Sequence, residues 1–333
     1  MLAAKRSKSV KLAATTDSLW DRSTHSRMAA WQDTMQSRTN RSRRRPIIGR
    51  VKLEEMRAWF AEPPNRFGTL PKDIAFEPAT MGQVRGEWVN PADGPIQRII
   101  LYFHGGGYIS GSPETHRPLA ARLAAASDAQ TLSVAYRLAP ECPYPGAVRD
   151  GLDSYRWLLA QKVPEQAIAL AGDCSGGGLA LGVAMAIRNA DLPMPACIVA
   201  MSPWADLTLS GPSVLDNAES DGMMTWAALT QCAQFYLGGA SPTEQFASPV
   251  FGDYRSLPPI MVHAGAQEIL RDDAGRIGER AAGAGVRVSV EVYDGQPHLF
   301  QALGSKEANV SIERLGAFIR TQTSAAMRRR TDT

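Results

Sequence analysis

Short apolar runs rich in β-branched residues alternate with helical stretches along most of this chain, and this alternation restricts its fold more than any other feature. Six runs predict strands, at residues 98–103, 131–136, 168–171, 197–201, 260–264 and 286–293, and a hairpin is expected earlier, within residues 73–89. Helices are predicted between them, at residues 118–126, 147–159, 177–189, 273–284 and 311–321. Strands and helices that alternate in this way form a parallel sheet covered by helices. The sequence therefore predicts an α/β fold with a mostly parallel central sheet flanked by helices.

Two segments lie outside this alternation. Residues 206–248 contain a helix-like stretch at 225–236 and no convincing strand, which is typical of a helical lid inserted into a sheet-and-helix fold. Residues 51–61 are predicted to form an amphipathic helix that ends before two consecutive prolines. The chain is divided accordingly into four parts: a basic arm with lid helices (1–66), a first part of the core (67–206), a lid insertion (207–248) and a second part of the core (249–333).

Charge is distributed unevenly along the 333 residues. The net charge is only +3, which argues against a nucleic-acid partner, yet the first 50 residues contain twelve Lys or Arg and three acidic residues. Such a segment is typical of a solvated arm, although its basic run at residues 41–45 could contact phosphate or anionic lipid. No apolar stretch reaches the length of a signal peptide's apolar region at the N-terminus or of a membrane span elsewhere. The sequence therefore predicts a soluble, cytoplasmic protein.

The segment Gly172-Asp-Cys-Ser-Gly-Gly177 joins a predicted strand to a predicted helix. A strand-to-helix turn with small residues two positions before and after its central residue is a nucleophile elbow. A Cβ atom at either small position would collide with the neighbouring turn, so the two flanking glycines mark Cys174 as the central residue. If Ser175 were central, Asp173 would occupy the first small position, which is sterically poor. The plain alternative is a glycine-rich turn that only ends a strand and holds a buried, inert cysteine.

A second glycine-rich segment, His104-Gly-Gly-Gly107, follows the predicted strand at 98–103. Three consecutive glycines let backbone N–H groups face a substrate, where they can stabilise the oxyanion of a tetrahedral intermediate. A phosphate-binding loop is disfavoured because no Lys-Ser or Lys-Thr pair follows the glycines. We expect His104 to brace this loop and not to act as a base.

His298 follows the last predicted strand, which is the expected place for a catalytic histidine in the chain order of nucleophile, acid and histidine. Three other histidines are more readily structural: His25, His116 and His263. The acid is expected on the loop after the strand at 260–264, where Glu268 comes first. Asp272 and Asp273 fall later, where capping of the next helix would explain them.

These segments together resemble the hormone-sensitive-lipase family of bacterial esterases, type IV, in the α/β-hydrolase superfamily. Five motifs occur in the family's order: His104-Gly-Gly-Gly107, Tyr136-Arg-Leu-Ala-Pro-Glu141, Gly172-Asp-Cys-Ser-Gly-Gly177, Ser202-Pro-Trp-Ala-Asp206 and Asp294-Gly-Gln-Pro-His298. The likeness covers about residues 70–322. It implies a lidded hydrolase that cleaves short-chain carboxylic esters without a cofactor or metal. It also implies three oxyanion donors, which are the backbone amides of Gly106, Gly107 and Ser175.

The chain departs from the family pattern at three positions. The nucleophile is normally serine and is Cys174 here, the next residue is usually alanine and is Ser175 here, and the acid is usually aspartate. Matching residues 268–272 to the family's Asp-Pro-Leu-Arg-Asp pattern places Glu268 at the acid, with the family's usual spacing to His298. We expect Ser175 to point away from the site and to supply only its N–H.

The resulting hypothesis is ester hydrolysis by Cys174, His298 and Glu268 through an acyl-enzyme on residue 174. Cys174 is either native, giving a cysteine esterase or acyl-transfer enzyme, or a Ser→Cys replacement, which the serine-esterase character of the other motifs slightly favours. An acyltransferase or amidase would use the same site. The rival from another class is a non-catalytic small-ligand-binding protein on this fold, which labelling with an acyl-site reagent would distinguish. The expected partner is a small-molecule ester, and a homodimer is one possible assembly.

Overall fold

The computed structural model describes residues 52–61, 69–72, 74–91 and 98–331, so the predicted basic arm lies outside the described residues. All of them belong to one compact unit, Arg50–Thr333. No helix among them has the length and apolar character needed to cross a bilayer. The domain boundaries given above stay a prediction.

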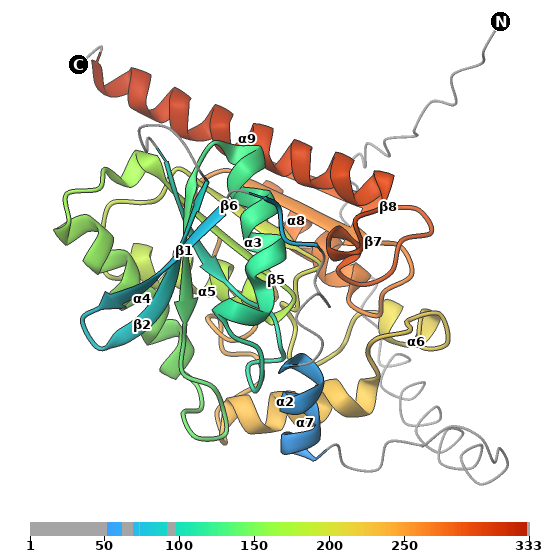
Figure 1. The fold of residues 1–333 in the computed structure, drawn as a ribbon. Helices are drawn as coiled ribbons and strands as arrows, with labels where there is room; N and C mark the ends of the chain where they lie inside the picture. Colours follow the sequence, from blue (N-terminus) through green and yellow to red (C-terminus); the bar gives the residue numbers. More distant parts are fainter. Residues whose placement is uncertain (1–51, 62–68, 73, 92–97, 332–333) are drawn as a thin grey trace, which may run out of the picture. The chain divides into compact units, whose positions relative to one another are not determined.

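An eight-stranded sheet runs through the middle of the described chain, in the order β1-β2-β4-β3-β5-β6-β7-β8 (Figure 1). The first two strands form an antiparallel hairpin, β2 also pairs antiparallel with β4, and every later pairing is parallel. The strands are β1 (Ile74–Met81), β2 (Val84–Pro91), β3 (Ile99–Phe103), β4 (Gln130–Ala135), β5 (Ile168–Asp173), β6 (Cys197–Met201), β7 (Ile260–Gly265) and β8 (Val288–Tyr293). The predicted α/β class and mostly parallel sheet are confirmed.

Helices cover both faces of the sheet, because the parallel strands are apolar on both sides. Alternate residues of β3 face opposite ways: Ile100 packs in one apolar cluster and Leu101 in the other. The first cluster includes side chains of α3 (Pro113–Ser127) and α9 (Lys306–Thr331). The second includes side chains of α4 (Gly146–Ala160), α5 (Ser175–Asn189) and α8 (Arg271–Gly283). Short 3₁₀ turns lie at Glu165–Ala167, Pro249–Phe251 and Phe300–Leu303.

Three further helices belong to the segments outside the alternation: α2 (Leu53–Ala61), α6 (Ser213–Asp216) and α7 (Trp226–Leu237). The helices α2 and α7 lie side by side, on the opposite side of the sheet from α9 in Figure 1, with Met56 Sδ 3.9 Å from Cys232 Sγ. Arg57 fastens α2 to the rest of the chain, because its Nε donates to the Ile109 carbonyl at 2.8 Å. The same guanidinium also pairs with Glu141 at 2.7 Å.

The predicted bounds need correction at two helices. The prediction started α3 at Pro118, but the helix begins at Pro113 and continues through Pro118. Ser112, just before the helix, and Thr115, in its first turn, form a capping box. The C-terminal helix extends from Lys306 to Thr331, well beyond the predicted 311–321, and the hydroxyl of Ser305 accepts from the amide of Ala308 at its start. A capping serine therefore marks the true start of both helices.

Candidate active site

Cys174 lies at the turn between β5 and α5, with φ 50° and ψ −123°. This left-handed conformation is strained for a residue with a side chain, and it persists because its surroundings leave no alternative. A Cβ atom on Gly172 would lie 2.2 Å from the Gly176 carbonyl oxygen, and one on Gly176 would lie 2.0 Å from the Phe103 carbonyl oxygen. The steric reason given for the two glycines is therefore confirmed.

His298 lies on the loop after β8, and its Nδ1 is hydrogen-bonded to the Glu268 carboxylate. The other carboxylate oxygen of Glu268 accepts from the Gly265 amide at 2.6 Å. Burial by itself would lower the pKa of His298, but the Cys174 thiol and the Glu268 carboxylate each raise it, and the pKa lies well above its ordinary value. The structure thus brings together the three residues that the sequence singled out.

Two side chains from the segment between β6 and β7 hold the loop that carries Glu268. Asp221 accepts from the Ile269 amide at 2.9 Å. Asn217 donates from Nδ2 to the carbonyls of Ala266 and Glu268, at 2.9 and 2.8 Å. Sequence reasoning missed both residues, because neither lies in a recognisable motif and their partners are about 50 positions away.

The prediction that Asp272 and Asp273 cap the following helix is wrong. Both lie in the first turn of α8, which has no side-chain cap. Asp273 instead accepts from the amides of Ala205 and Asp206, at 2.8 and 2.9 Å, and Asp272 accepts from the Ser213 amide at 2.7 Å. Their carboxylates therefore hold the loop after β6 against α8.

The loop His104–Gly107 lies beside the elbow, because β3 and β5 are paired neighbours and Phe103 is in register with Gly172. Gly106 and Gly107 have φ of 124° and 64°, values that favour glycine. The carbonyl of Gly106 accepts from the Ser110 amide at 3.0 Å. Within the described part of the chain, the N–H groups of Gly106, Gly107 and Ser175 donate no hydrogen bond. These three amides are therefore free to bind an anionic oxygen.

A buried polar cluster that the sequence did not reveal lies behind this loop. Asp173 accepts from the Tyr102 hydroxyl at 2.5 Å and from the Gly105 amide at 3.1 Å, and its other oxygen lies 3.4 Å from His116 Nε2. His104 stacks on Tyr136 with ring centroids 4.3 Å apart. Burial, helped by His116, lowers the pKa of His104 to about 3, so its imidazole is neutral at pH 7. His104 thus braces the loop, as expected.

Ser175 also makes a side-chain contact that the sequence did not predict. That only its N–H serves the reacting group stays a prediction. The hydroxyl of Ser175 accepts from the Tyr108 amide at 3.3 Å, and the side chain is fully buried. Tyr108 directly follows Gly107, so this contact joins the start of α5 to the end of the glycine loop. The sequence signal for this contact is the serine at a position where the family usually has alanine.

Side chains of the lid cover this site. The ring of Tyr108 stacks on that of Tyr236 in α7, with centroids 3.7 Å apart, and a Cβ atom on Gly107 would lie 3.0 Å from Cys232 Sγ. Cys174 is 8% exposed, His298 2% and Glu268 0%. The three side chains are therefore almost entirely buried.

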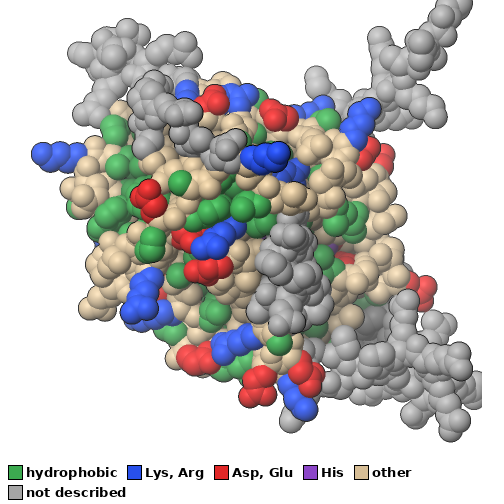
Figure 2. Space-filling view, viewed as in Figure 1, with side chains coloured by type: hydrophobic (Ala, Val, Ile, Leu, Met, Phe, Trp, Pro, Cys, Tyr) green, Lys and Arg blue, Asp and Glu red, His purple; other side chains and the backbone are tan. Residues whose placement is uncertain are grey.

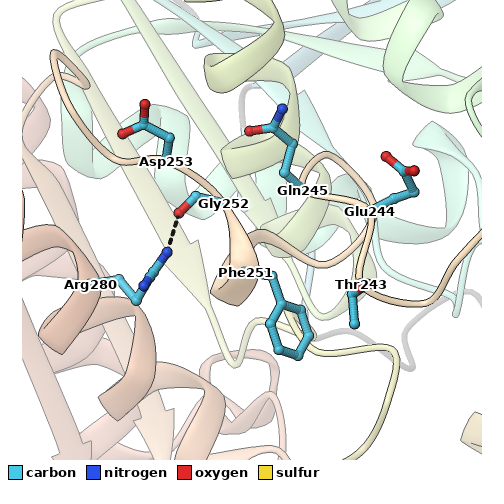
Figure 3. Close-up of a pocket in the computed structure, with 7 residues that line it drawn as sticks. All are labelled: Thr243, Glu244, Gln245, Phe251, Gly252, Asp253 and Arg280. Atoms are coloured by element: carbon cyan, nitrogen blue, oxygen red, sulfur yellow. Dashed lines mark hydrogen bonds between the residues drawn. The ribbon is translucent and has the colours of Figure 1, made fainter.

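A surface hollow of about 430 Å³ lies apart from these residues, between the segment 243–253 and α8. Figure 3 shows its lining, where Arg280 donates to the Gly252 carbonyl at 2.8 Å. Asp253 at its rim is paired with Arg255 at 2.7 Å. On the face seen in Figure 2, basic and acidic side chains are interspersed without a continuous track of either sign. Neither feature adds a reactive group to the site.

Comparison with known proteins agrees with this geometry. Residues 100–302 match the family model described as alpha/beta hydrolase fold. An acetyl-hydrolase of Streptomyces hygroscopicus is 38% identical over 283 residues, which cover 83% of this chain and 92% of that protein. A crystal structure of an esterase from the bacterial hormone-sensitive lipase family has a TM-score of 0.79 and 36% identity, covering 83% of this chain and 94% of that one. The structure of EstE5 soaked with p-nitrophenyl butyrate has a TM-score of 0.80 and 36% identity, covering 87% and 98%.

The chain therefore belongs to the alpha/beta hydrolase fold family and, within it, to the esterases of the hormone-sensitive-lipase family. It is an esterase.

Proposed function

We propose that this esterase cleaves short-chain carboxylic esters through an acyl-enzyme on Cys174, with His298 as the base and Glu268 as the residue that orients it. The observation that carries the proposal is the contact of His298 with both partners, since the Cys174 thiol and the Glu268 carboxylate each raise its pKa. A nucleophile next to a base that a third group orients is the arrangement that nucleophilic catalysis needs.

In the first half of the reaction, the sulfur of Cys174 attacks the ester carbonyl carbon while His298 holds the thiol proton. The carbonyl electrons move to oxygen, and the amides of Gly106, Gly107 and Ser175 bind this oxyanion. The intermediate then collapses, the bond to the alkoxy oxygen breaks, and His298 passes its proton to the leaving alcohol. A thioester on Cys174 remains.

In the second half, His298 takes a proton from a water molecule, which attacks the thioester carbonyl. The bond to sulfur breaks, the carboxylic acid leaves, and the proton returns from His298 to Cys174. The balance is one ester and one water converted to one acid and one alcohol. Glu268 keeps the imidazole oriented through Nδ1 in both halves of the reaction.

The preference for short acyl chains rests on the enclosure of the site. Cys174 is 8% exposed, and side chains of α7 lie against the glycine loop. Enclosed pockets of ordinary size hold a small acyl group more readily than a long chain at a lipid surface. The related EstE5 was soaked with p-nitrophenyl butyrate, the ester of a four-carbon acid.

The proposal is tested by measuring turnover of p-nitrophenyl esters with two to sixteen acyl carbons. The parent chain is compared with two variants at residue 174. We expect acetate and butyrate esters to react fastest, Cys174→Ser to be active, and Cys174→Ala to lose about 10⁴-fold or more of kcat. Cys142→Ala, a change at a half-buried cysteine outside the site, is the matched control and should keep the parent rate.

Mass spectrometry after mixing with an activated ester should place the acyl group on Cys174. Full activity of Cys174→Ala, or an acyl group on Ser175, would overturn the assigned nucleophile. Faster turnover of emulsified long-chain triglycerides than of butyrate esters would overturn the acyl preference.

A further inference from the structure

We propose that the hydroxyl of Ser175 is a positioning group that holds the glycine loop at a fixed distance from the nucleophile elbow. This inference rests on the proposed function, because it assumes that the amides of Gly106 and Gly107 act together with that of Ser175. It adds a second role to Ser175, which the mechanism above uses only through its backbone N–H.

The two residues that flank Cys174 in the chain hold the two ends of the glycine loop. Asp173, on one side, accepts from the amide of Gly105 at 3.1 Å. Ser175, on the other, accepts from the amide of Tyr108 at 3.3 Å. The two donors that the mechanism assigns to the loop, the amides of Gly106 and Gly107, lie between these attachment points.

The loop needs such attachments because its glycines have no side chains to pack. Gly106 and Gly107 adopt positive φ, a region where glycine loses much conformational freedom when it is fixed. Within the loop, the Ser110 amide and hydroxyl both donate to the Gly106 carbonyl, at 3.0 and 2.7 Å. The contact with Ser175 ties this turn to α5, which carries the third donor.

Ser175 is itself held in place. It is fully buried as the first residue of α5, and its side chain forms a hydrogen bond with Tyr136. The Tyr136 hydroxyl donates to the His104 carbonyl at 2.7 Å, so the same network reaches the start of the glycine loop. A hydroxyl anchored in this way can fix the position of the Tyr108 amide.

Loss of the Ser175 hydroxyl should weaken stabilisation of the transition state. Charge develops on the carbonyl oxygen only as the bond to sulfur forms, and preorganised donors act at that stage. The Ser175 hydroxyl is bonded to protein groups, so its loss should leave substrate binding intact. Small displacements of catalytic donors cost between tenfold and a hundredfold in rate. We therefore expect an effect on kcat and not on KM.

Ser175→Ala and Ser133→Ala, compared on p-nitrophenyl butyrate, test this assignment. The hydroxyl of Ser133 is buried and has no hydrogen-bond partner among the described residues, so its removal is a matched control away from the site. We expect kcat to fall about tenfold in Ser175→Ala with KM within twofold, and the Ser133→Ala values to equal the parent's. Ser175→Cys, whose sulfur is a weak acceptor, should lose less than Ser175→Ala.

Two further readouts separate positioning from general damage. A trifluoromethyl ketone that forms a tetrahedral adduct with residue 174 should bind about tenfold more weakly to Ser175→Ala, matching the loss in kcat. The amide of Tyr108 should exchange its hydrogen faster in that variant than in Ser133→Ala.

Equal kcat in Ser175→Ala and Ser133→Ala, or a loss confined to KM, would overturn the positioning role while leaving the proposed function standing. Failure of the proposed function would look different: the parent chain would turn over no short-chain ester, or Cys174→Ala would keep the parent activity.

Discussion

Backbone sterics hold the elbow side of the site, whereas side chains from other parts of the chain hold the loop that carries Glu268. At the elbow, neither Gly172 nor Gly176 has room for a Cβ atom. The amide of Cys174 donates to the Met201 carbonyl at 2.9 Å, and the Cys174 carbonyl accepts from the Trp204 amide at 2.8 Å. On the acid side, Asp221 and Asn217 reach across from the segment between β6 and β7 to fix residues 266–269.

The two sides should respond differently to substitution. Backbone atoms that meet within about 3 Å cannot adjust without moving a strand or helix, so the elbow should fail abruptly. A loop held by several side-chain hydrogen bonds loses them one at a time, so the acid side should weaken by degrees. His298 contacts both sides, so its pKa depends on Cys174 at the elbow and on Glu268 on the acid side.

Glu268→Gln is expected to have the largest effect, a loss of about 10⁴-fold in kcat, by analogy with neutralised triad acids. The amide cannot support the charge that His298 acquires, and it can stabilise the wrong tautomer. Steady-state kinetics of Glu268→Gln beside Asp272→Asn measure this. Asp272 accepts from the Ser213 amide and pairs with Arg271, so its variant should stay within about threefold of the parent. A larger loss of kcat in Asp272→Asn than in Glu268→Gln would assign the role of the acid to Asp272.

Gly176→Ala should lower kcat/KM by at least about 100-fold, since the added Cβ would lie 2.0 Å from the Phe103 carbonyl oxygen and must displace the elbow. It should also lower the free energy of unfolding by about 1–3 kcal/mol. Gly275→Ala in α8 is the matched control, because nothing lies within 4 Å of its added Cβ. Urea denaturation should show a free energy of unfolding for Gly275→Ala about 0.5–1 kcal/mol above that of the parent. Equal behaviour of the two variants would contradict the steric account.

Asp221→Ala should act more mildly, with kcat about tenfold lower and the free energy of unfolding lower by about 1–3 kcal/mol, because it leaves the buried Ile269 amide without its acceptor. Asp153→Ala provides the comparison, since Asp153 is exposed and forms only an i,i+3 pair with Arg156. Activity assays and urea denaturation of both variants check this. A loss as large as that of Glu268→Gln would mean that the acid side is as rigid as the elbow.

The smallest effect is a change in the titration of His298. Cys174→Ala removes one of the two partners that raise its pKa, and Glu268→Gln removes the other, so the pKa of His298 should fall in each variant. Imidazole NMR signals, with Cys142→Ala as the control, measure the change. An unchanged pKa of His298 in Cys174→Ala would show that Cys174 does not affect the histidine.

The same titration affects stability. Because folding raises the pKa of His298, its contribution to the free energy of unfolding is fully present below the ordinary pKa of about 6.5 and is lost as pH rises through the folded pKa. Urea denaturation of the parent should therefore show stability falling above about pH 6.5, and less steeply in Cys174→Ala.

Contacts between neighbours in the chain made part of this structure predictable from the sequence. The short apolar runs predicted the strands, with Cys197–Met201 matched at both ends. The two glycines around Cys174 predicted the elbow. The conflict at Gly172 is with Gly176, four residues further on, whereas the conflict at Gly176 is with Phe103 on the neighbouring strand. The chain order of the motifs predicted that Cys174, His298 and Glu268 would meet, which the structure shows geometrically.

Contacts between distant segments depended on the tertiary structure. Asp221 and Ile269 are 48 positions apart, and Ser175 and Tyr108 are 67 apart, so their hydrogen bonds follow from loop paths that no local pattern encodes. The same cause explains why Asp273 looked like a helix cap yet binds the amide of Ala205. A polar side chain can often bond either to a neighbour in the chain or to a distant group. The sequence shows only the neighbour, because the distant group comes within reach through strand register and the course of the loops.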